Sequence, residues 1–373
     1  MKSNKIFVVI FRSISINFLS LHKIMTRPLT LLLVLLLPFS CLAQVGGSAV
    51  YSFLDIPASA RVAAMGGTVV AINDDDLNLA FQAPSLLHKN MDKSLTFSGV
   101  SYLDGVKFGD AIYAFDKEKL GTFMTGIHYG NYGTFVETNT YGDTEGSFKA
   151  ADYALVLGWG YKLNQKFNIG ANFKGLYSDY YIYNAFALAL DVSATFHDTT
   201  HHFTVTVLAR NVGLQMKNYI KGNNEPLPAE VIIGASKRLS HTPLRFSLTY
   251  RHDEKNDLGY NDPNELGDVD PLTGEPNRKE ISALNNIARH FIVGAEILLT
   301  KNFHIRGAYN FQRRSELRIP GRPGTTGFSF GVGLKVSKFV ISYGRGNYHL
   351  GAAANHVSIS TNLSEFSKKL IVD

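Results

Sequence analysis

From residue 93 onward, the chain is built of segments in which large apolar residues alternate with small or polar ones. In "ADYALVLGWGYKL" (151–163), Leu155, Leu157 and Trp159 share one parity, while Gly158 and Gly160 lie on the other. Period-2 alternation predicts β-strands with one apolar face. Fourteen such segments follow one another: 93–103, 107–116, 121–138, 148–163, 167–181, 184–197, 203–217, 230–240, 244–254, 289–300, 303–316, 327–337, 339–349 and 355–366.

The lengths and connections of these segments indicate a membrane barrel. Many exceed the usual five or six residues of a soluble strand and match tilted membrane-spanning strands of about 9–11 residues. Tight turns follow several even-numbered segments, whereas longer connections (139–147, 218–229, 255–288 and 317–326) follow odd-numbered ones. We therefore predict an all-β membrane protein, a 14-stranded antiparallel outer-membrane β-barrel with its short turns in the periplasm and a short N-terminal plug segment containing helix. A large soluble β-sandwich or jelly roll explains the alternation equally well, but not the asymmetry of the connections.

The N-terminus carries an export signal. From Met25 the chain reads "MTRPLTLLLVLLLPFSCLAQ", with Arg27 before an apolar run and small residues ending at Ala43. This pattern predicts a secretory signal peptide over residues 1–43, with Met25 as a candidate start. A lipoprotein signal centred on Cys41 is the alternative.

Charge and cysteine content narrow the function. Five of the 37 basic residues and none of the 31 acidic ones fall in residues 1–43, so the remainder holds 32 basic and 31 acidic residues. This balance argues against a nucleic-acid partner. Cys41 is the only cysteine, which argues against disulfides, thiolate metal sites and cysteine nucleophiles in the mature chain.

Clusters that bear chemistry are few. The histidines of "FHDTTHHF" and the acidic loop 255–288 lack metal-site spacing, and no His-Glu-x-x-His or strand–turn–helix Gly-x-Ser-x-Gly motif occurs. We expect no enzyme and no cofactor. An enzyme assembled from a Ser/His/Asp cluster at one rim is a further alternative. A basic cluster offers candidate contacts to anions or glycolipid, because guanidinium groups suit phosphate: Arg313, Arg314, Arg318 and Arg322.

The segment before the first strand, "SARVAAMGGTVVAINDDDLNLAFQAPSLL" (59–87), predicts local structure. Residues 60–65 favour a helix that Gly66-Gly67 ends. No strand precedes the glycine pair, so a dinucleotide-binding turn is not indicated. Asp74 to Asp76 predict a turn or a helix N-terminus before Leu77, with a cation site as the alternative.

This segment resembles the N-terminal region of the FadL-like outer-membrane barrels, in which a plug fills the lumen ahead of fourteen strands. Within that group the chain most resembles the PorQ-like proteins of the type IX secretion system of Bacteroidota, on "GGSAVYSFLDIPASAR", "GNNEPLPAEVIIGASKRLSHTPLRFSL", "VDPLTGE" and "TNLSEF". The family's plug often carries Asn-Pro-Ala where this chain has Ala83-Pro84-Ser85. The plug motif implied by the resemblance consists of Arg61, Gly66, Gly67, Asp74, Asp75, Asp76 and Pro84.

The resemblance implies a signal peptide (1–43), a plug (44–92), a barrel (93–366) and a C-terminal tail (367–373). It implies a non-enzymatic barrel that anchors a PorZ-like surface protein. That complex works with the PorU–PorV sortase pair, which attaches secreted cargo to anionic lipopolysaccharide. The alternative is a FadL-like transport channel for hydrophobic molecules.

Overall fold

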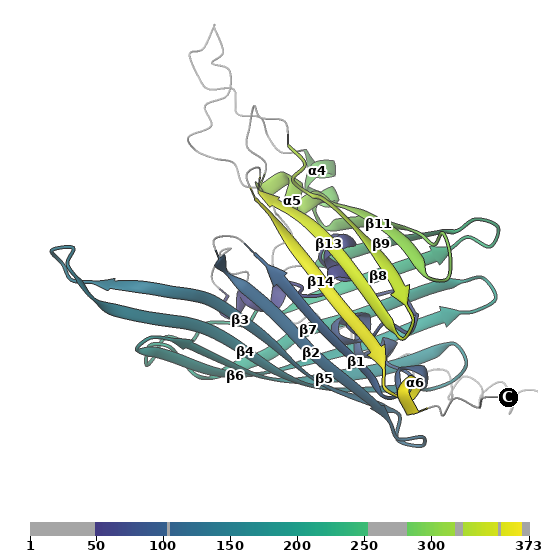
Figure 1. The fold of residues 1–373 in the computed structure, drawn as a ribbon, viewed down its shortest axis with the longest axis horizontal. Helices are drawn as coiled ribbons and strands as arrows, with labels where there is room; N and C mark the ends of the chain where they lie inside the picture. The colour runs from purple at the N-terminus through teal and green to yellow at the C-terminus, as the bar shows by residue number, and fades with distance from the viewer. Residues whose placement is uncertain (1–48, 103–104, 253–281, 318–323, 350–351, 368–373) are drawn as a thin grey trace, which may run out of the picture. The chain divides into compact units, whose positions relative to one another are not determined.

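The alternating segments form one closed sheet. The computed structural model describes residues 49–102, 105–252, 282–317, 324–349 and 352–367. Each strand pairs antiparallel with its neighbours in the chain, and β1 closes the barrel on β14 with Phe97 opposite Ile359 (Figure 1). The predicted 14-stranded barrel is confirmed, and the sandwich alternative is wrong. The strands are β1 (Ser94–Ser101), β2 (Lys107–Asp116), β3 (Thr122–Thr138), β4 (Thr144–Lys162), β5 (Phe167–Tyr180), β6 (Tyr183–Asp198), β7 (Phe203–Lys217), β8 (Glu230–Arg238), β9 (Leu244–His252), β10 (Phe291–Ile297), β11 (Phe303–Asn310), β12 (Phe328–Val336), β13 (Phe339–His349) and β14 (Ala352–Asn362).

The outer face of the barrel is an exposed apolar belt. In β4, Leu155 and Leu157 are 54% and 51% exposed, whereas the alternating residues Ala154 and Val156 are buried. A continuous apolar surface of this extent is a liability in water and is typical of a barrel wall in contact with lipid. The structure therefore supports an outer-membrane location. Other strands contribute exposed apolar side chains to the belt: Phe97, Ile127, Phe173, Leu190, Val207, Ile233, Leu248, Val293, Ile305, Val332 and Ile359. No helix among the described residues is long and apolar enough to cross a membrane.

The two rims differ in the length of their connections. The rim with the turns after even-numbered strands, here called the short-turn rim, has connections at 117–121, 163–166, 199–202, 239–243, 298–302 and 337–338. The opposite, long-loop rim includes the connections 218–229, 253–290 and 311–327. Two connections on that rim have only two residues each, 181–182 and 350–351.

Two predicted boundaries were wrong. The predicted loop 139–147 is partly strand, because β4 begins at Thr144 and leaves only residues 139–143 as the turn after β3. The predicted strand 303–316 ends at Asn310, where helix α5 (Phe311–Leu317) begins. The Asn310 side chain accepts a hydrogen bond from the Arg313 amide (2.9 Å), and this cap favours a helix over continued strand.

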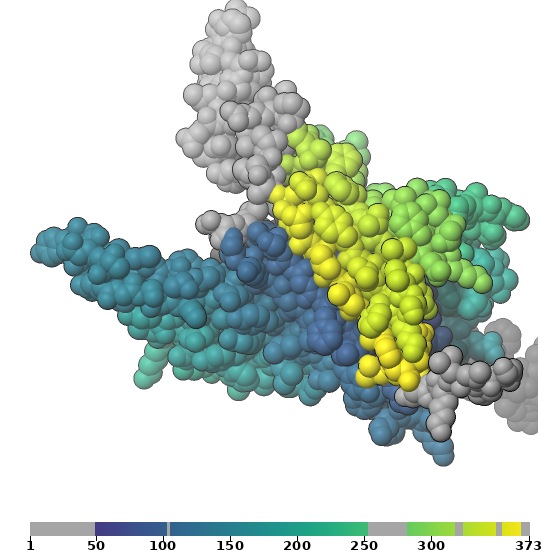
Figure 2. Space-filling model, in the orientation of Figure 1, coloured from purple at the N-terminus to yellow at the C-terminus, as the bar shows by residue number. Residues whose placement is uncertain are grey.

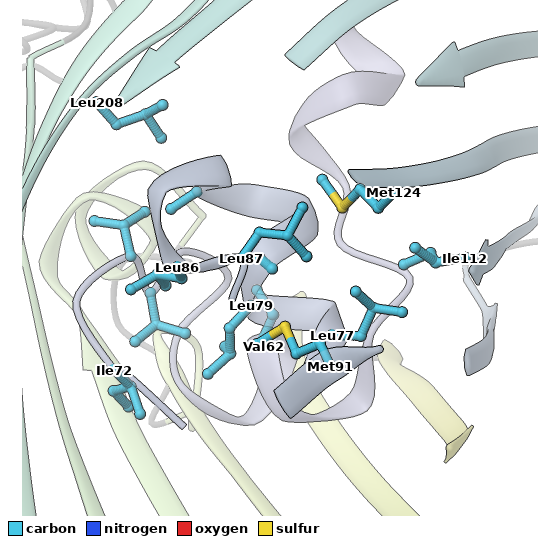
Figure 3. Close-up of a cluster of buried hydrophobic side chains, with 14 of the residues drawn as sticks. Val62, Ile72, Leu77, Leu79, Leu86, Leu87, Met91, Ile112, Met124 and Leu208 are labelled. Carbon is cyan, nitrogen blue, oxygen red and sulfur yellow. The ribbon is translucent and has the colours of Figure 1, made fainter. Parts of the chain in front are cut away.

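The core of the protein lies inside the barrel. Residues 49–92, here called the lumen segment, form the short helices η1 (Ser52–Asp55), α2 (Ala60–Ala64), α3 (Leu77–Gln82), η2 (Pro84–Leu86) and η3 (Lys89–Met91). Helix α2 contacts β11 to β14, and η2 contacts β4 to β6. Figure 3 shows the cluster of buried side chains that joins the segment to the wall. Its members include Val62, Leu77, Leu79, Leu86, Leu87 and Met91 from the segment, and Ile112, Met124 and Leu208 from strands.

After β14 the chain forms the short helix α6 (Ser364–Ser367), in which the Phe366 ring lies edge-on to Phe339 at 5.9 Å. The proposed signal peptide falls outside the described residues.

Candidate functional site

A buried ion cluster joins the lumen segment to the barrel wall. Arg61 of α2 binds Glu296 of β10 through two hydrogen bonds, Nε to Oε1 at 3.0 Å and Nη2 to Oε2 at 3.1 Å. The same guanidinium donates to both carboxylate oxygens of Asp74 (2.9 and 2.7 Å) and to Asp76 (3.1 Å). All three guanidinium nitrogens of Arg61 are therefore used: Nε and Nη2 donate to the wall carboxylate, and Nη1 and Nη2 donate to carboxylates of the lumen segment.

Two further arginines complete this cluster from the wall. Arg245 of β9 donates to Asp74 and to Glu296, each at 2.9 Å, and Arg306 of β11 donates to Glu296 at 2.9 Å. The six side chains carry three positive and three negative formal charges, so the cluster is neutral. A fully paired neutral cluster is the arrangement that tolerates burial, whereas a lone charge here would carry a large desolvation cost. Burial alone would raise the pKa of Asp74, but Arg61 and Arg245 hold it well below its ordinary value.

Local sequence explains why Arg61 is held in this position. Ser59 precedes α2, and its hydroxyl accepts from the Val62 amide at 3.5 Å. The helix ends in a pair of hydrogen bonds, Gly66 N to Ala63 O (3.1 Å) and Gly67 N to Val62 O (3.0 Å). This is the pattern of a Schellman motif, which needs a left-handed residue, and Gly66 supplies it with φ 92°.

The aspartate run contributes in three different ways. Asp74 and Asp76 bind Arg61, and Asp76 also caps α3 by accepting from the Asn78 amide at 3.1 Å. Asp75 is exposed and contacts Nε2 of His88 at 3.0 Å. Nδ1 of His88 lies 2.7 Å from the Leu86 carbonyl. Both neighbours are acceptors only, so both contacts are hydrogen bonds when the imidazole is doubly protonated.

Glycines of the wall allow the lumen segment to approach closely. A Cβ added to Gly170 of β5 would lie 2.5 Å from both the Pro84 carbonyl oxygen and the Ser85 nitrogen. The Ser85 amide donates to Ser193 Oγ at 2.8 Å, and its hydroxyl is 2.7 Å from Thr195 Oγ1. Pro84 thus lies directly against the wall, at a site where any side chain on the strand would displace it.

The other end of the lumen segment is held near the long-loop rim. Nδ1 of His128 lies 2.5 Å from Asp110, and Nε2 lies 3.2 Å from the Phe53 carbonyl oxygen. The Phe53 ring stacks on the imidazole with centroids 5.3 Å apart. Asp55 accepts from Arg210 at 2.8 Å, and Arg210 also binds Glu230 of the wall. Ion pairs therefore hold the lumen segment to the wall at two levels of the barrel, through Arg61 and through Asp55.

A small cavity lies between the Arg61 cluster and the Asp55–Arg210 ion pair. Its volume is about 50 Å³, with Leu54, Ile56 and Phe81 among its apolar neighbours. Its polar lining includes Asp110, His128, Lys174 and Arg210. A space of this size accommodates a few ordered waters, and pockets for drug-sized ligands measure about 300–1,000 Å³.

The predicted basic cluster is described only in part. Arg313 reaches toward the lumen, because a Cβ added to Gly67 would lie 2.6 Å from its Nη2, and it donates to Ser329 at 3.4 Å. Arg314 donates to the Gly324 carbonyl at 2.7 Å. Arg318 and Arg322 lie outside the described residues. Contact of the cluster with anions or glycolipid stays a prediction.

Two histidines of "FHDTTHHF", considered above as metal ligands, contact neighbouring side chains instead. His197 contacts Thr204 at 2.8 Å, and His201 contacts Asp198 at 3.3 Å on the short-turn rim. Within the described ranges, no group of three or more His, Cys, Asp or Glu side chains is arranged to hold a metal ion.

Sequence reasoning missed the wall residues of the Arg61 cluster: Arg245, Glu296 and Arg306. A signal for them was present, since each has the inward parity of its strand, and a charge there needs a partner inside the barrel.

Comparison with known proteins returns structural similarities only. No family model matches the chain, and no curated protein matches it. Similar solved structures include the toluene transporter TbuX of Ralstonia pickettii (TM-score 0.46, 13% identity, 83% of this chain and 98% of that one). The toluene transporter TodX of P. putida gives a TM-score of 0.48 at 12% identity (82% and 98% coverage). A Pseudomonas aeruginosa FadL homologue gives 0.44 at 10% identity (82% and 98%). Sequence identities this low indicate a similarity of fold alone and carry no function from those proteins to this chain.

Proposed function

We propose that this protein is a PorQ-like, non-enzymatic barrel of the type IX secretion system, which anchors a PorZ-like surface protein at the outer membrane. The long-loop rim faces the cell exterior in this proposal. The anchored complex cooperates with the PorU–PorV sortase pair, which attaches cargo to anionic lipopolysaccharide. Two things support the proposal: the sequence resemblance over nearly the whole mature chain, and the packing of the lumen segment against the barrel wall.

The packing of the lumen segment against the wall is the observation that carries the proposal. Opening a route would separate Arg61 from Glu296 and Asp55 from Arg210, and would break the close contact of Pro84 with the wall. Each separation leaves a charge without its partner, which costs free energy unless a ligand compensates. A barrel built to stay closed acts through its surface, and the larger surface loops lie on the long-loop rim.

The test is a deletion of the barrel in its own organism, complemented with the intact chain. We expect the PorZ-like protein to leave the cell surface, and the cargo to lose its attachment to lipopolysaccharide. Both effects should be reversed when the intact chain is supplied. Normal attachment of cargo, together with lost uptake of labelled long-chain fatty acid, contradicts the proposal.

The second candidate is transport of hydrophobic molecules. The observation that favours it is the apolar side of the cavity, where Leu54, Ile56 and Phe81 meet beside the lumen segment. Withdrawal of residues 49–58 would enlarge this space. Two of the solved structures named above are toluene transporters, but their similarity to this chain is too low to carry a substrate to it. The fatty-acid arm of the deletion experiment separates the two candidates.

A further inference from the structure

The two longest strands extend past the barrel wall as a hairpin. β3 has 17 residues and β4 has 19. The last pair between β2 and β3 is Lys107 with Asn131, and the last pair between β5 and β4 is Tyr180 with Ala150. β3 and β4 continue to pair with each other up to Thr138 and Thr144. Residues 132–149, here called the projecting hairpin, therefore have no strand on either side among the described residues (Figures 1 and 2).

The projecting hairpin is internally braced. Its base bends at a bulge between Asn131 and Thr134, where Gly133 has φ 91° and its amide donates to the Asn131 side chain at 2.8 Å. Phe135 stacks on its cross-strand partner Phe148 with centroids 5.3 Å apart. Asn139 then closes the tip by a hydrogen bond from its amide to the Asp143 carbonyl (3.0 Å). An isolated two-stranded hairpin is marginally stable in water, so these contacts preorganise it.

The two edges of the hairpin are not equally open. On the β4 side, the Tyr181 ring of the neighbouring turn lies 4.9 Å from Phe148, and its hydroxyl donates to Glu137 at 2.6 Å. Apart from this bond to the Glu137 side chain of β3, no hydrogen bond, ring contact or ion pair joins residues 134–138 to another described part of the chain outside β4. Natural sheets protect exposed edges with Lys, Pro or inward charges. This edge reads Thr-Phe-Val-Glu-Thr, which has high β-propensity and carries neither Lys nor Pro.

The charge of the hairpin limits what can pair with it. Glu137, Asp143 and Glu145 are acidic, and Lys149 is the one basic residue of the range, which leaves a net charge of −2. An added strand with cationic side chains would complement this surface, and one with acidic side chains would be repelled.

We propose that the projecting hairpin is the docking element for the surface partner. An extended strand of the partner that carries Lys or Arg pairs with the β3 edge at residues 134–138, by β-strand addition. Main-chain hydrogen bonds supply the affinity, and the acidic side chains select the partner. This inference rests on the proposed anchoring function and names the surface that performs it.

The first experiment compares four strains for the PorZ-like protein retained on cells: wild type, barrel deletion, a truncation that replaces residues 134–147 with Asn-Gly, and Tyr141→Ser at the tip. Asn-Gly favours the type I′ turn of a two-residue hairpin, so the wall can close below the removed part. Heat-dependent gel mobility confirms that each barrel folds. We expect the truncation to release the partner as fully as the deletion does, at least about tenfold relative to wild type, and Tyr141→Ser to retain it.

The outcomes separate this inference from the proposed function. If the deletion releases the partner and the folded truncation retains it, docking lies elsewhere and this inference is overturned while the anchoring function stands. If the deletion itself retains the partner, the anchoring function fails, and the docking proposal fails with it.

A matched pair of point variants identifies the edge. Val136 and Ser147 are directly opposite each other, so proline at either position disturbs the hairpin's own pairing to a similar degree. With purified barrel and purified PorZ-like protein, we expect Val136→Pro to weaken binding about tenfold more than Ser147→Pro. Equal effects overturn the choice of edge. A Glu145→Lys variant should weaken binding at low salt and less so at high salt. Unchanged affinity at every salt concentration overturns the requirement for a cationic strand.

Discussion

Arg61 and Glu296 lie 235 residues apart in the chain and form a two-point ion pair inside the barrel, with Nε–Oε1 at 3.0 Å and Nη2–Oε2 at 3.1 Å. The Glu296 side chain is completely buried. Because one partner belongs to α2 and the other to β10, the pair fixes the lumen segment relative to the wall. Arg61 takes no part in the backbone hydrogen bonds of the barrel sheet. The lumen segment can therefore move away from the wall while the strands stay paired.

Replacing Arg61 with Ala should loosen the lumen segment without unfolding the barrel. The substitution removes one of the two arginines that Asp74 and Glu296 share, and leaves Arg245 as the other. Removal of one member of a buried ion pair costs up to about 3–5 kcal/mol. We expect higher single-channel conductance in planar bilayers and faster protease cleavage within residues 59–92. Heat-dependent gel mobility should stay that of the folded barrel.

The control for this variant is Lys166→Ala, which breaks the exposed pair of Lys166 with Asp198 on the short-turn rim. Exposed pairs contribute about 0–1 kcal/mol, so conductance and protease resistance should match the wild type. Arg61→Ala with wild-type conductance and wild-type protease resistance would show that packing alone holds the segment.

A second prediction concerns the glycines of β5. Gly170→Val places its side chain on the Pro84 carbonyl and the Ser85 nitrogen, so η2 has to move away from the wall. Overpacking of this kind costs about 1–3 kcal/mol. Gly175, on the same strand, has nothing within 4 Å of an added Cβ, so Gly175→Val is the matched control. Hydrogen exchange at the amides of residues 85–87 should rise only in Gly170→Val. Equal exchange in the two variants would contradict the close packing.

The sequence predicted most of the wall because alternation is a local pattern. The strands of the barrel repeat it every two residues, and inward glycines such as Gly158 and Gly160 fall on the expected parity. The ion cluster could not be predicted in the same way. Glu296 meets Arg61 only through barrel closure, and no local pattern specifies that pairing. The boundary at Thr144 was missed because a polar, Gly-containing stretch has turn-like composition, although Phe148 was available to pair with Phe135.

A third prediction is a pH window for the contact of His88 with Asp75. Burial lowers the pKa of His88, but the hydrogen bonds to Asp75 and to the Leu86 carbonyl outweigh it, and the pKa is raised above 6.5. The hydrogen bond from His88 lowers the pKa of Asp75 below 3.8. A raised histidine pKa contributes stability fully below the unfolded value, about 6.5, and this is lost as pH rises through the folded pKa. A lowered aspartate pKa contributes stability above about 3.9, which is lost as pH falls through the folded pKa.

The pair should therefore hold residues 86–92 most firmly between about pH 4 and pH 6.5. Hydrogen exchange at these amides, corrected for the intrinsic pH dependence, should show more protection at pH 6 than at pH 9. The difference should vanish in His88→Gln and in Asp75→Asn. A difference that persists in both variants would assign the pH dependence to other groups.

The last prediction tests the position of the apolar belt with the chain's own fluorophore. Trp159 is the only tryptophan. It lies near the short-turn end of β4, stacks on Tyr161 with centroids 5.9 Å apart, and donates from Nε1 to the Leu120 carbonyl at 2.8 Å. An aromatic ring with a satisfied polar edge at a strand end is typical of the interfacial girdle. In reconstituted vesicles, lipids brominated near the headgroup should quench its emission more than lipids brominated near the chain end. Trp159→Phe removes the signal and gives the background. Stronger quenching from the chain ends would move the belt toward the short-turn rim, and quenching by aqueous iodide alone would place Trp159 outside the bilayer.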